Sequence, residues 1–294
     1  MNLRILGHSL EIIAAAFIFQ KNSLYALAPP PCQLTYHNGT VISGTVNLYH
    51  IYLGKFLSST TKILETFANN LGQTAWMSVL PNSYYYMTKT GQKILAASGT
   101  KFAGSASYLT TASSLNLSNA VIQNYVNQFI GSGKTADPNG IYLVFFNGGF
   151  TAAGWNTGPA GWCGYHIPNS HIAVIGNPAS FGMLNTNSNC IPTLFKNGES
   201  PNGDIGADSM LSTYAHETAD LITNVDGNGW NCNAAGSLQE VADFCNRNFI
   251  HVIGNYNINV KGAKYLIQAI YQLNYGCVLA PQQPSATATT ASEL

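Results

Sequence analysis

Charged side chains are scarce in this chain of 294 residues. Asp, Glu, Lys and Arg together make up 8% of it, against about a quarter of an average soluble domain. The 12 basic and 12 acidic residues cancel, so the formal net charge is zero. Nucleic acids and anionic membrane surfaces both attract proteins through an excess of Lys and Arg. The composition therefore argues against both as partners.

The chain also lacks the C-x-x-C pairs on which cysteine-based zinc sites are built, although it contains six cysteines. An even number of cysteines in an exported chain is typical of disulfides. The predicted bridges are Cys163–Cys190 and Cys245–Cys277, which leaves Cys32 and Cys232 either paired or free.

No run of 18 consecutive apolar residues occurs, so the sequence predicts no membrane-spanning helix. Residues 1–28 have the layout of a secretory signal peptide, with a basic residue at Arg4, an apolar run over 12–19 and an A-x-A cleavage site ending at Ala28. The alternative is a disordered segment or a packed N-terminal helix. A signal peptide and paired cysteines together predict a secreted protein, in which the sequons at Asn38 and Asn116 are candidate glycosylation sites.

The pattern of apolar residues predicts a single domain over residues 29–280. Alternating or continuous apolar runs predict strands at 45–52, 141–146, 165–167 and 171–175 and a hairpin over 256–275. Helical spacing predicts helices at Ser58–Leu71, 116–130, 208–224 and near 237–245, whereas 77–87 is expected to be extended. We therefore predict an α/β (mixed α+β) fold with a mixed β-sheet and flanking helices. Residues 281–294 are small and polar and are expected to form a disordered tail.

Most of the few acidic residues fall in one part of the chain. Seven of the 12 lie between positions 204 and 243, namely Asp204, Asp208, Glu217, Asp220, Asp226, Glu240 and Asp243. One histidine, His216, lies among them. A charge-poor chain that gathers carboxylates beside a histidine is more typical of a site than of a solvated surface.

His216, Glu217 and Asp220 follow the spacing of the zinc-peptidase motif H-E-x-x-H, with Asp in place of the second His. On a helix, His216 and Asp220 are one turn apart and share a face, so both can bind one metal ion. In the parent motif the Glu takes a proton from the water that the metal activates, which makes Glu217 the candidate general base. The motif predicts a zincin-like active-site helix.

The third metal ligand must come from another element. Glu240, on the next predicted helix, is the candidate, and Asp243, one turn further on, would be its partner or would orient His216. The parent motif binds zinc, and zinc is the expected metal here. One imidazole with two carboxylates is a harder ligand set than that of the parent motif, which makes Mn or Ca more competitive as alternatives. Without a metal, His216 could form an acid–base pair with Glu217 and Glu240. Alternatively, the histidine and the carboxylates would form only a buried hydrogen-bonded network that caps the helix.

Other residues are weaker candidates. His166 follows Cys163 closely on a predicted strand and could face the site. Asp208 is expected to cap the helix, and Asp204, in a Gly-rich turn, would cap the helix or bind calcium. His50 alternates on its strand and is expected to be structural or exposed.

The motif is part of a wider pattern along the chain. Its pieces are P-N-G-D-I-G-A-D-S-M-L-S-T-Y-A-H-E-T-A-D-L-I-T-N from Pro201, Q-E-V-A-D-F-C from Gln239, T-Y-H-N-G from Thr35, D-P-N-G-I-Y-L-V from Asp137 and C-G-Y-H from Cys163. Together they resemble the plant Exordium / phosphate-induced protein family over about residues 34–279. The resemblance implies a secreted, apoplastic or cell-wall protein linked to cell expansion and growth signalling. The family usually has G-H-E-L-A-E where this chain has A-H-E-T-A-D, so the carboxylate of Asp220 is one methylene shorter.

Two functions follow from these observations. The residues favour a metal-dependent hydrolase, a peptidase or amidase, with Glu217 as general base and His216, Asp220 and Glu240 as metal ligands. The resemblance favours a non-catalytic extracellular protein that binds a peptide or glycan. In both cases the expected partner is an extracellular peptide or a cell-wall polymer, and the sequence does not indicate an oligomeric state.

Overall fold

The computed structural model describes residues 32–109, 115–131, 135–155, 161–181, 189–195, 198–234 and 236–283. The predicted signal peptide at 1–28 lies outside the described residues, as does the predicted tail from residue 284 onward. None of the described helices is long and apolar enough to cross a membrane. The described residues form a mixed α+β domain, as the sequence predicts.

The described part of the chain contains long helices, 3-10 turns and many short strands. The helices are α1 (Ser58–Leu71), α2 (Ala75–Ser83), α3 (Asn119–Ile130) and α4 (Ile205–Thr223), and the 3-10 turns are η1 (Pro178–Phe181), η3 (Thr193–Phe195) and η4 (Asp243–Cys245). The strands are β1 (Thr35–Tyr36), β2 (Thr45–Leu53), β3 (Tyr85–Met87), β4 (Lys93–Leu95), β5 (Gly99–Tyr108), β6 (Leu115–Asn116), β7 (Gly140–Phe146), β8 (Phe150–Thr151), β9 (Gly164–His166), β10 (Ile172–Gly176), β11 (Trp230–Ala234), β12 (Ser237–Glu240), β13 (Ile258–Val260), β14 (Ala263–Tyr265), β15 (Ile270–Gln272) and β16 (Gly276–Val278).

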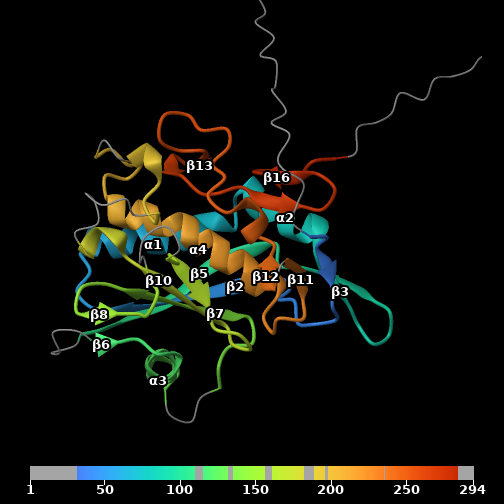
Figure 1. Ribbon diagram of the computed structural model, residues 1–294, viewed down its shortest axis with the longest axis horizontal. Helices are drawn as coiled ribbons and strands as arrows, with labels where there is room; N and C mark the ends of the chain where they lie inside the picture. Colours follow the sequence, from blue (N-terminus) through green and yellow to red (C-terminus); the bar gives the residue numbers. More distant parts are fainter. Residues whose placement is uncertain are drawn as a thin grey trace, which may run out of the picture.

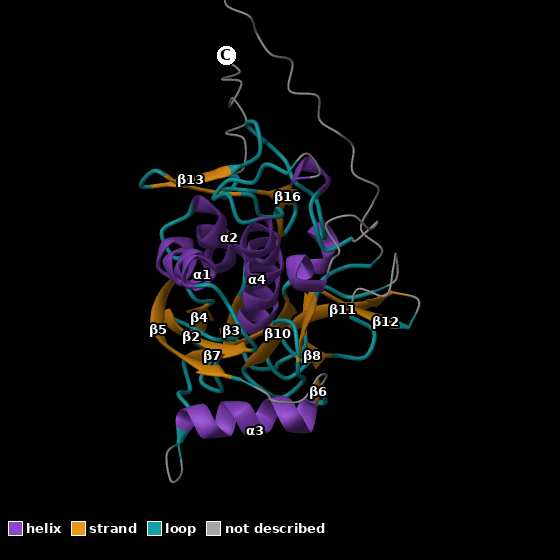
Figure 2. Cartoon of the chain, turned by 90° about the vertical axis from the view of Figure 1, so that its left-hand side faces the viewer, coloured by secondary structure: helices purple, strands orange, loops and turns teal. Residues whose placement is uncertain are grey.

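Five strands form the central sheet, in the order β5-β2-β7-β10-β9. The first four run parallel, whereas β9 pairs antiparallel with β10 and forms the edge. Parallel neighbours need crossover connections, which α1 and α2 provide between β2 and β5, and α3 provides between β5 and β7. Figures 1 and 2 show α1, α2 and α4 on one face of this sheet and α3 on the other.

The strand β7 shows how both faces of the sheet are covered. All of its residues are buried, as expected for a central strand of a parallel sheet, and the strand predicted at 141–146 is confirmed. Leu143 and Phe145 belong to the core that includes residues of α1, α2 and α4. Val144 and Phe146 belong to a second core that includes residues of α3. The sheet is therefore the middle of three layers.

The prediction that residues 77–87 are extended is wrong for most of that stretch. It begins within the helix α2, and only Tyr85–Met87 is a strand. The Thr74 hydroxyl accepts a hydrogen bond from Met77 N–H at 3.0 Å, which is an N-cap that starts the helix. Trp76 and Leu80 then bury the inner face of α2 in the core. The N-cap at Thr74 indicates the start of α2, and the pattern of apolar residues alone does not reveal it.

The prediction of a helix near residues 237–245 is wrong as well. β12 forms a hairpin with β11 in which Glu240 lies opposite Asn231, and only Asp243–Cys245 forms a 3-10 turn. Gly236, with φ 84°, lies between the two strands and allows the tight connection that a hairpin needs. Glu240 and Asp243 are therefore not neighbours on one helical face.

The helix α4 begins earlier than predicted. Asp204, and not Asp208, is the N-cap, because its Oδ1 accepts a hydrogen bond from Ala207 N–H at 3.0 Å. Asp208 lies in the first turn, where it is buried and accepts hydrogen bonds from the backbone and the side chain of Asn202 at 2.9 and 2.5 Å. Both carboxylates therefore organise the entry into α4.

The C-terminal region contains two hairpins rather than the single one predicted over 256–275. β13 and β14 pair around Lys261 and Gly262, and β15 then pairs with β16. Gln268 lies in the segment between the two hairpins and is 3% exposed. This segment brings Gln268 beneath α4, where it takes part in the site described below.

Three disulfides join distant parts of the chain: Cys32–Cys232, Cys163–Cys190 and Cys245–Cys277. The last two are the pairs predicted from the sequence. The first resolves the alternative left open for the remaining two cysteines, so all six are paired.

Candidate functional site

The helix α4 has one face against the sheet and another toward a cavity. Tyr214 and Leu211 belong to the hydrophobic core. On the other side, the helix lines a cavity of about 600 Å³ with Ser209, Ser212, Thr213, His216 and Glu217. Asp243 and Gly164 belong to the facing walls. The helix thus places His216 and Glu217 of the H-E-x-x-D motif at a cavity wall.

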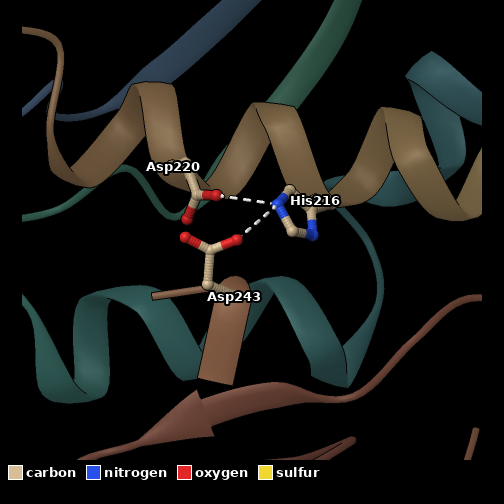
Figure 3. A group of neighbouring side chains, drawn as sticks. All are labelled: His216, Asp220 and Asp243. Carbon is tan, nitrogen blue, oxygen red and sulfur yellow. Dashed lines mark ion pairs between the residues drawn. The ribbon is translucent and has the colours of Figure 1, made fainter. Parts of the chain in front are cut away.

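One ring nitrogen of His216 faces two carboxylates, as Figure 3 shows. Its Nε2 is 3.1 Å from Asp220 Oδ2 and 3.4 Å from Asp243 Oδ1. One ligand atom from each of the three residues lies within 4.8 Å of the others. On the far side of the ring, His216 Nδ1 is 3.1 Å from Gln268 Oε1. We call His216, Asp220, Asp243 and Gln268 the His216 cluster.

Gln268 determines which imidazole nitrogen faces the carboxylates. Its Nε2 donates a hydrogen bond to Ala242 C=O at 2.8 Å, so its Oε1 is the atom that faces His216. An amide oxygen only accepts hydrogen bonds, and His216 Nδ1 must therefore carry a proton. His216 Nε2 is left as the nitrogen that shares a proton, or a metal ion, with Asp220 and Asp243.

The protonation states in the His216 cluster depend on one another. Burial by itself lowers the pKa of His216, but the carboxylates of Asp220, Asp243 and Glu217 together outweigh burial and hold that pKa well above its usual value. Burial raises the pKa of Asp220 against the pull of His216. Burial also acts to raise the pKa of Asp243, but its hydrogen bond to His216 and the charge of that ring prevail and lower it. Without a metal, His216 is therefore an imidazolium at neutral pH.

A second cluster of charged side chains is formed around His166, which contacts Glu217 and Glu240. His166, on β9, has its Nδ1 3.4 Å from Glu217 Oε2 and its Nε2 3.5 Å from Glu240 Oε1. Glu240 also accepts a hydrogen bond from the side chain of Asn224, which directly follows α4. We call His166, Glu217, Glu240 and Asn224 the His166 cluster.

The His166 cluster also has shifted pKa values. Burial lowers the pKa of His166, but the hydrogen bond to Glu217 and the charge of Glu240 outweigh it and raise the pKa to about 9. Burial, followed by the charge of Asp220, raises the pKa of Glu240 to about 8. At neutral pH both His166 and Glu240 therefore tend to hold a proton, and His166 lies between the two glutamates.

The structure brings Asp243, and not Glu240, to His216 and Asp220. Glu240 ends the strand β12, where it faces His166, whereas Asp243 lies in η4 and faces His216. The prediction of Glu240 as third ligand rests on a helix that does not form. Asp204 and Asp208 are at the start of α4 and do not line the cavity.

Gly164 allows β9 to lie close to α4. A Cβ at this position would be 2.4 Å from Thr213 Cγ2 and 2.9 Å from Val174 C=O, which is closer than side chains tolerate. The close approach places His166, two residues further on the same face of β9, against Glu217. A glycine inside a predicted strand is the sequence signal for such an approach.

Three site residues have no signal in the sequence pattern: Gln268, Asn224 and Arg247. Gln268 and Asn224 are neutral and hold charged groups in place. Arg247 lines the cavity and lies near His216 only through contacts between segments distant in sequence. No spacing rule connects these positions with the H-E-x-x-D motif.

The donor atoms of the His216 cluster fit a divalent metal ion. They are one imidazole nitrogen and two carboxylate oxygens, which zinc, manganese and calcium accept to different degrees. Gln268 holds the opposite nitrogen of His216, which is how protein metal sites commonly orient a histidine ligand. Asp220 is held in the same way, because its Oδ1 accepts a hydrogen bond from Ala242 N–H at 2.8 Å and its Oδ2 faces His216.

Residues 34–277 match the family described as the phosphate-induced protein 1 conserved region. Over 275 residues the chain is 24% identical to protein EXORDIUM-like 3 of Arabidopsis thaliana, which covers 81% of this chain and 80% of that protein. Over 285 residues it is 22% identical to protein EXORDIUM-like 5 of the same plant, covering 84% and 77%. Over 257 residues it is 23% identical to protein PHOSPHATE-INDUCED 1 of Nicotiana tabacum, covering 77% of each. No solved structure matches the chain.

The matched region spans most of the chain and includes both histidine clusters and the residues that line the cavity. The resemblance seen in the sequence is thereby confirmed, and this chain belongs to the Exordium-like, phosphate-induced protein 1 family.

Proposed function

We propose that this protein is a secreted, divalent-metal-dependent hydrolase that cleaves peptide or other amide bonds. The observation that carries the proposal is the convergence of His216, Asp220 and Asp243, whose ligand atoms lie within 4.8 Å of one another. His216, Asp243 and Glu217 line one cavity. A candidate metal site and a neighbouring carboxylate at one cavity are the parts that metal-assisted hydrolysis requires.

His216 Nε2 and the carboxylates of Asp220 and Asp243 would hold the metal. Zinc is the first expectation, with manganese or calcium as alternatives, because two of the donors are carboxylate oxygens. A divalent metal at this position supplies Lewis acidity, which polarises a carbonyl and makes water more acidic. Gln268 would keep His216 Nε2 directed at the ion, and Ala242 N–H would keep Asp220 Oδ2 directed at it.

Glu217 is the proposed general base. It follows His216 directly on α4, its side chain is 5% exposed, and it lines the cavity. Its carboxylate would accept a proton from the attacking water and deliver it to the leaving nitrogen. His166, with Nδ1 at 3.4 Å from Glu217 Oε2, would hold that carboxylate in position. The chain's own residues thus supply both the base and the group that orients it.

The free edge of β9 favours a peptide as the substrate. Ile167 N–H donates a hydrogen bond to Ile172 C=O at 2.9 Å. In an antiparallel pair, every second residue of a strand directs its backbone N–H and C=O toward the partner strand. The backbone groups of Gly164 and His166 therefore point away from β10. They have no hydrogen-bond partner among the described residues. An extended peptide can pair with such an edge. Because Gly164 lines the cavity beside Glu217, a peptide bound there would run past the proposed base.

A location outside the cell fits the covalent structure. Three disulfides persist in oxidising surroundings and are rare in the cytosol. The sequon residues Asn38 and Asn116 are both exposed, so glycosylation there stays a prediction that the fold permits. With the predicted signal peptide, these features support secretion to the cell exterior or cell wall.

The test is cleavage of an internally quenched peptide library by the full chain after signal removal, supplied with zinc, manganese or calcium. We expect Glu217→Gln to lower kcat/KM by about 1000-fold while metal content and melting temperature stay close to wild type. The matched control is Glu199→Gln, which removes an exposed carboxylate outside the cavity wall and should leave cleavage unchanged.

Two results would contradict the hydrolase. One is cleavage that persists in Glu217→Gln, and the other is a folded wild-type chain that cleaves no peptide with any of the three metals. In the second case, retained binding of a peptide or glycan would support the alternative of a non-catalytic extracellular protein in cell expansion or growth signalling.

A further inference from the structure

Arg247 is a cation without a carboxylate partner at the cavity of the proposed site. The chain has two arginines, Arg4 and Arg247, and Arg247 lines the cavity that also contains His216 and Glu217. None of the ion pairs of the described residues includes Arg247. The side-chain contact that the described residues offer it is a weak one, with Nη2 3.8 Å from Cys163 Sγ. Its guanidinium donors are therefore available to a ligand.

The backbone of Arg247 is tied to the His216 cluster. Its N–H donates to Gln268 Oε1 at 3.4 Å, and the same oxygen accepts a hydrogen bond from His216 Nδ1 at 3.1 Å. Arg247 has φ 58°, a left-handed conformation that non-glycine residues adopt at a cost. The Cys245–Cys277 disulfide anchors the chain two residues earlier. The position of Arg247 relative to His216 is therefore set by the fold and not by a flexible loop.

The rest of the cavity restricts which group Arg247 can bind. Glu217 and Asp243 line the same cavity and repel anions from their own surroundings, so Arg247 is the position at which an anionic group is favoured. A guanidinium presents its donors in a planar fork that matches a carboxylate. Phe249 and Ile191 also line the cavity and pack in one hydrophobic cluster, which suits an apolar side chain.

We propose that Arg247 binds a carboxylate of the ligand, so that the cavity selects peptides that carry a carboxylate beside an apolar residue. The carboxylate is either the C-terminus of the peptide or the side chain of an Asp or Glu. The unpaired edge of β9 favours a peptide over a uronic-acid glycan, because a glycan has no main-chain amides to pair with Gly164 and His166. The inference rests on the proposed function for the cavity as the substrate site, but the binding step needs no cleavage.

Binding of matched dansyl peptides to the full chain tests the inference. The probes are dansyl-Ala-Ala-Phe with a free carboxylate, the same peptide as its C-terminal amide, and dansyl-Ala-Asp-Phe amide. We expect at least one carboxylate-bearing probe to bind about tenfold more tightly than the uncharged amide, since a charge-assisted hydrogen-bonded pair contributes about that factor. Arg247→Gln should remove the difference, and Arg247→Lys should retain part of it.

The matched control is Lys62→Gln, which removes one exposed positive charge on α1 and should keep the tenfold preference. Which of the two carboxylate probes binds identifies the C-terminus or the acidic side chain as the source. Equal binding of all three probes to wild type would overturn the inference, and this comparison needs no variant to fold. A preference that survives in folded Arg247→Gln would also overturn it, as would Arg247-dependent binding of trigalacturonate with no binding of the peptides.

The outcome is independent of the outcome for catalysis. If the chain cleaves nothing but binds the carboxylate probes through Arg247, the hydrolase fails and the carboxylate site stands. If the chain cleaves peptides through Glu217 without regard to a carboxylate, the hydrolase stands and the role of Arg247 fails.

Discussion

A histidine lies on each side of α4, and the two are in opposite states. His50 belongs to β2 on the sheet side, whereas His216 belongs to α4 itself and is only partly buried at the cavity. On the sheet side, His50 is fully buried between two hydroxyls, with Nδ1 2.9 Å from Tyr52 Oη and Nε2 2.8 Å from Tyr214 Oη. On the cavity side, His216 Nε2 faces the carboxylates of Asp220 and Asp243. Burial lowers the pKa of His50 to about 3, whereas neighbouring carboxylates, that of Asp220 above all, hold the pKa of His216 well above its usual value despite burial.

The comparison teaches that burial keeps a histidine neutral when its neighbours are hydroxyls, whereas several neighbouring carboxylates outweigh burial and favour the charged form. Hydroxyl groups satisfy both nitrogens of a neutral imidazole and leave the sheet side of α4 free of charge. Carboxylates make the cavity side a concentrated charged site in a chain with only 8% charged residues. One helix thus separates a packing surface from a charged one, and each side can be tested by itself.

The largest expected effect is the loss of stability in acid caused by His50. Its folded pKa of about 3 lies below the usual 6.5 or so, so the unfolded chain binds a proton that the folded chain refuses. Stability is therefore lost as pH falls from about 6.5 toward 3, and the contribution of His50 between pH 7 and pH 4 is about 3 kcal/mol. Urea unfolding at both pH values measures it.

The control for this experiment is His50→Gln, which can still bond to the tyrosine hydroxyls but does not titrate. Its loss of stability between pH 7 and pH 4 should be smaller than that of wild type by about 3 kcal/mol. Identical losses in the two proteins would show that His50 is not the buried neutral base described above.

The next effect distinguishes the carboxylate of Glu240, at the end of β12, from that of Asp243. Asp243→Asn should weaken zinc binding by about 100-fold or more, because it removes a proposed ligand, whereas Glu240→Gln should change it by less than about tenfold. Competition with a fluorescent chelator measures both affinities. The reverse order would restore Glu240 as the third ligand and contradict the geometry of the His216 cluster.

The smallest effect concerns the contact between β9 and the cavity side of α4. Gly164→Ala places a Cβ 2.4 Å from Thr213 Cγ2 and 2.9 Å from a backbone carbonyl, and we expect it to lower the free energy of unfolding by about 2 kcal/mol. The matched control is Gly148→Ala, where an added Cβ meets nothing within 4 Å. Equal stability of the two variants in urea would mean that β9 moves away from α4 without cost.

Much of the framework could be predicted from the sequence because its signals are local. The continuous apolar run at 141–146, the helical spacing of Ser58–Leu71 and the one-turn spacing of His216 and Asp220 depend only on neighbouring residues. Each appears in the structure as the pattern predicts. The two disulfides predicted among six cysteines also appear.

The remainder depends on contacts that are distant in sequence. Asp243 could not be identified as the third ligand because 237–245 has helical spacing, but Ser237–Glu240 pairs with β11 instead and Asp243 begins a 3-10 turn. This turns Glu240 toward His166 and Asp243 toward His216. The burial of His50 depends on α4, more than 150 positions later, supplying the hydroxyl of Tyr214. Gln268 lies between two hairpins and Arg247 lies between η4 and β13. Both reach the site through contacts between segments distant in sequence, which no short motif indicates.

The central claim is that His216, Asp220 and Asp243 hold one divalent metal ion at the cavity side of α4. The most direct measurement is the metal content of the folded, purified chain after equilibration with zinc, combined with anomalous scattering from its crystals. The account predicts one ion per chain, located between His216 Nε2 and the two carboxylates, and its loss in His216→Ala. A folded wild-type chain that retains no zinc, manganese or calcium, or an ion bound elsewhere, would contradict it.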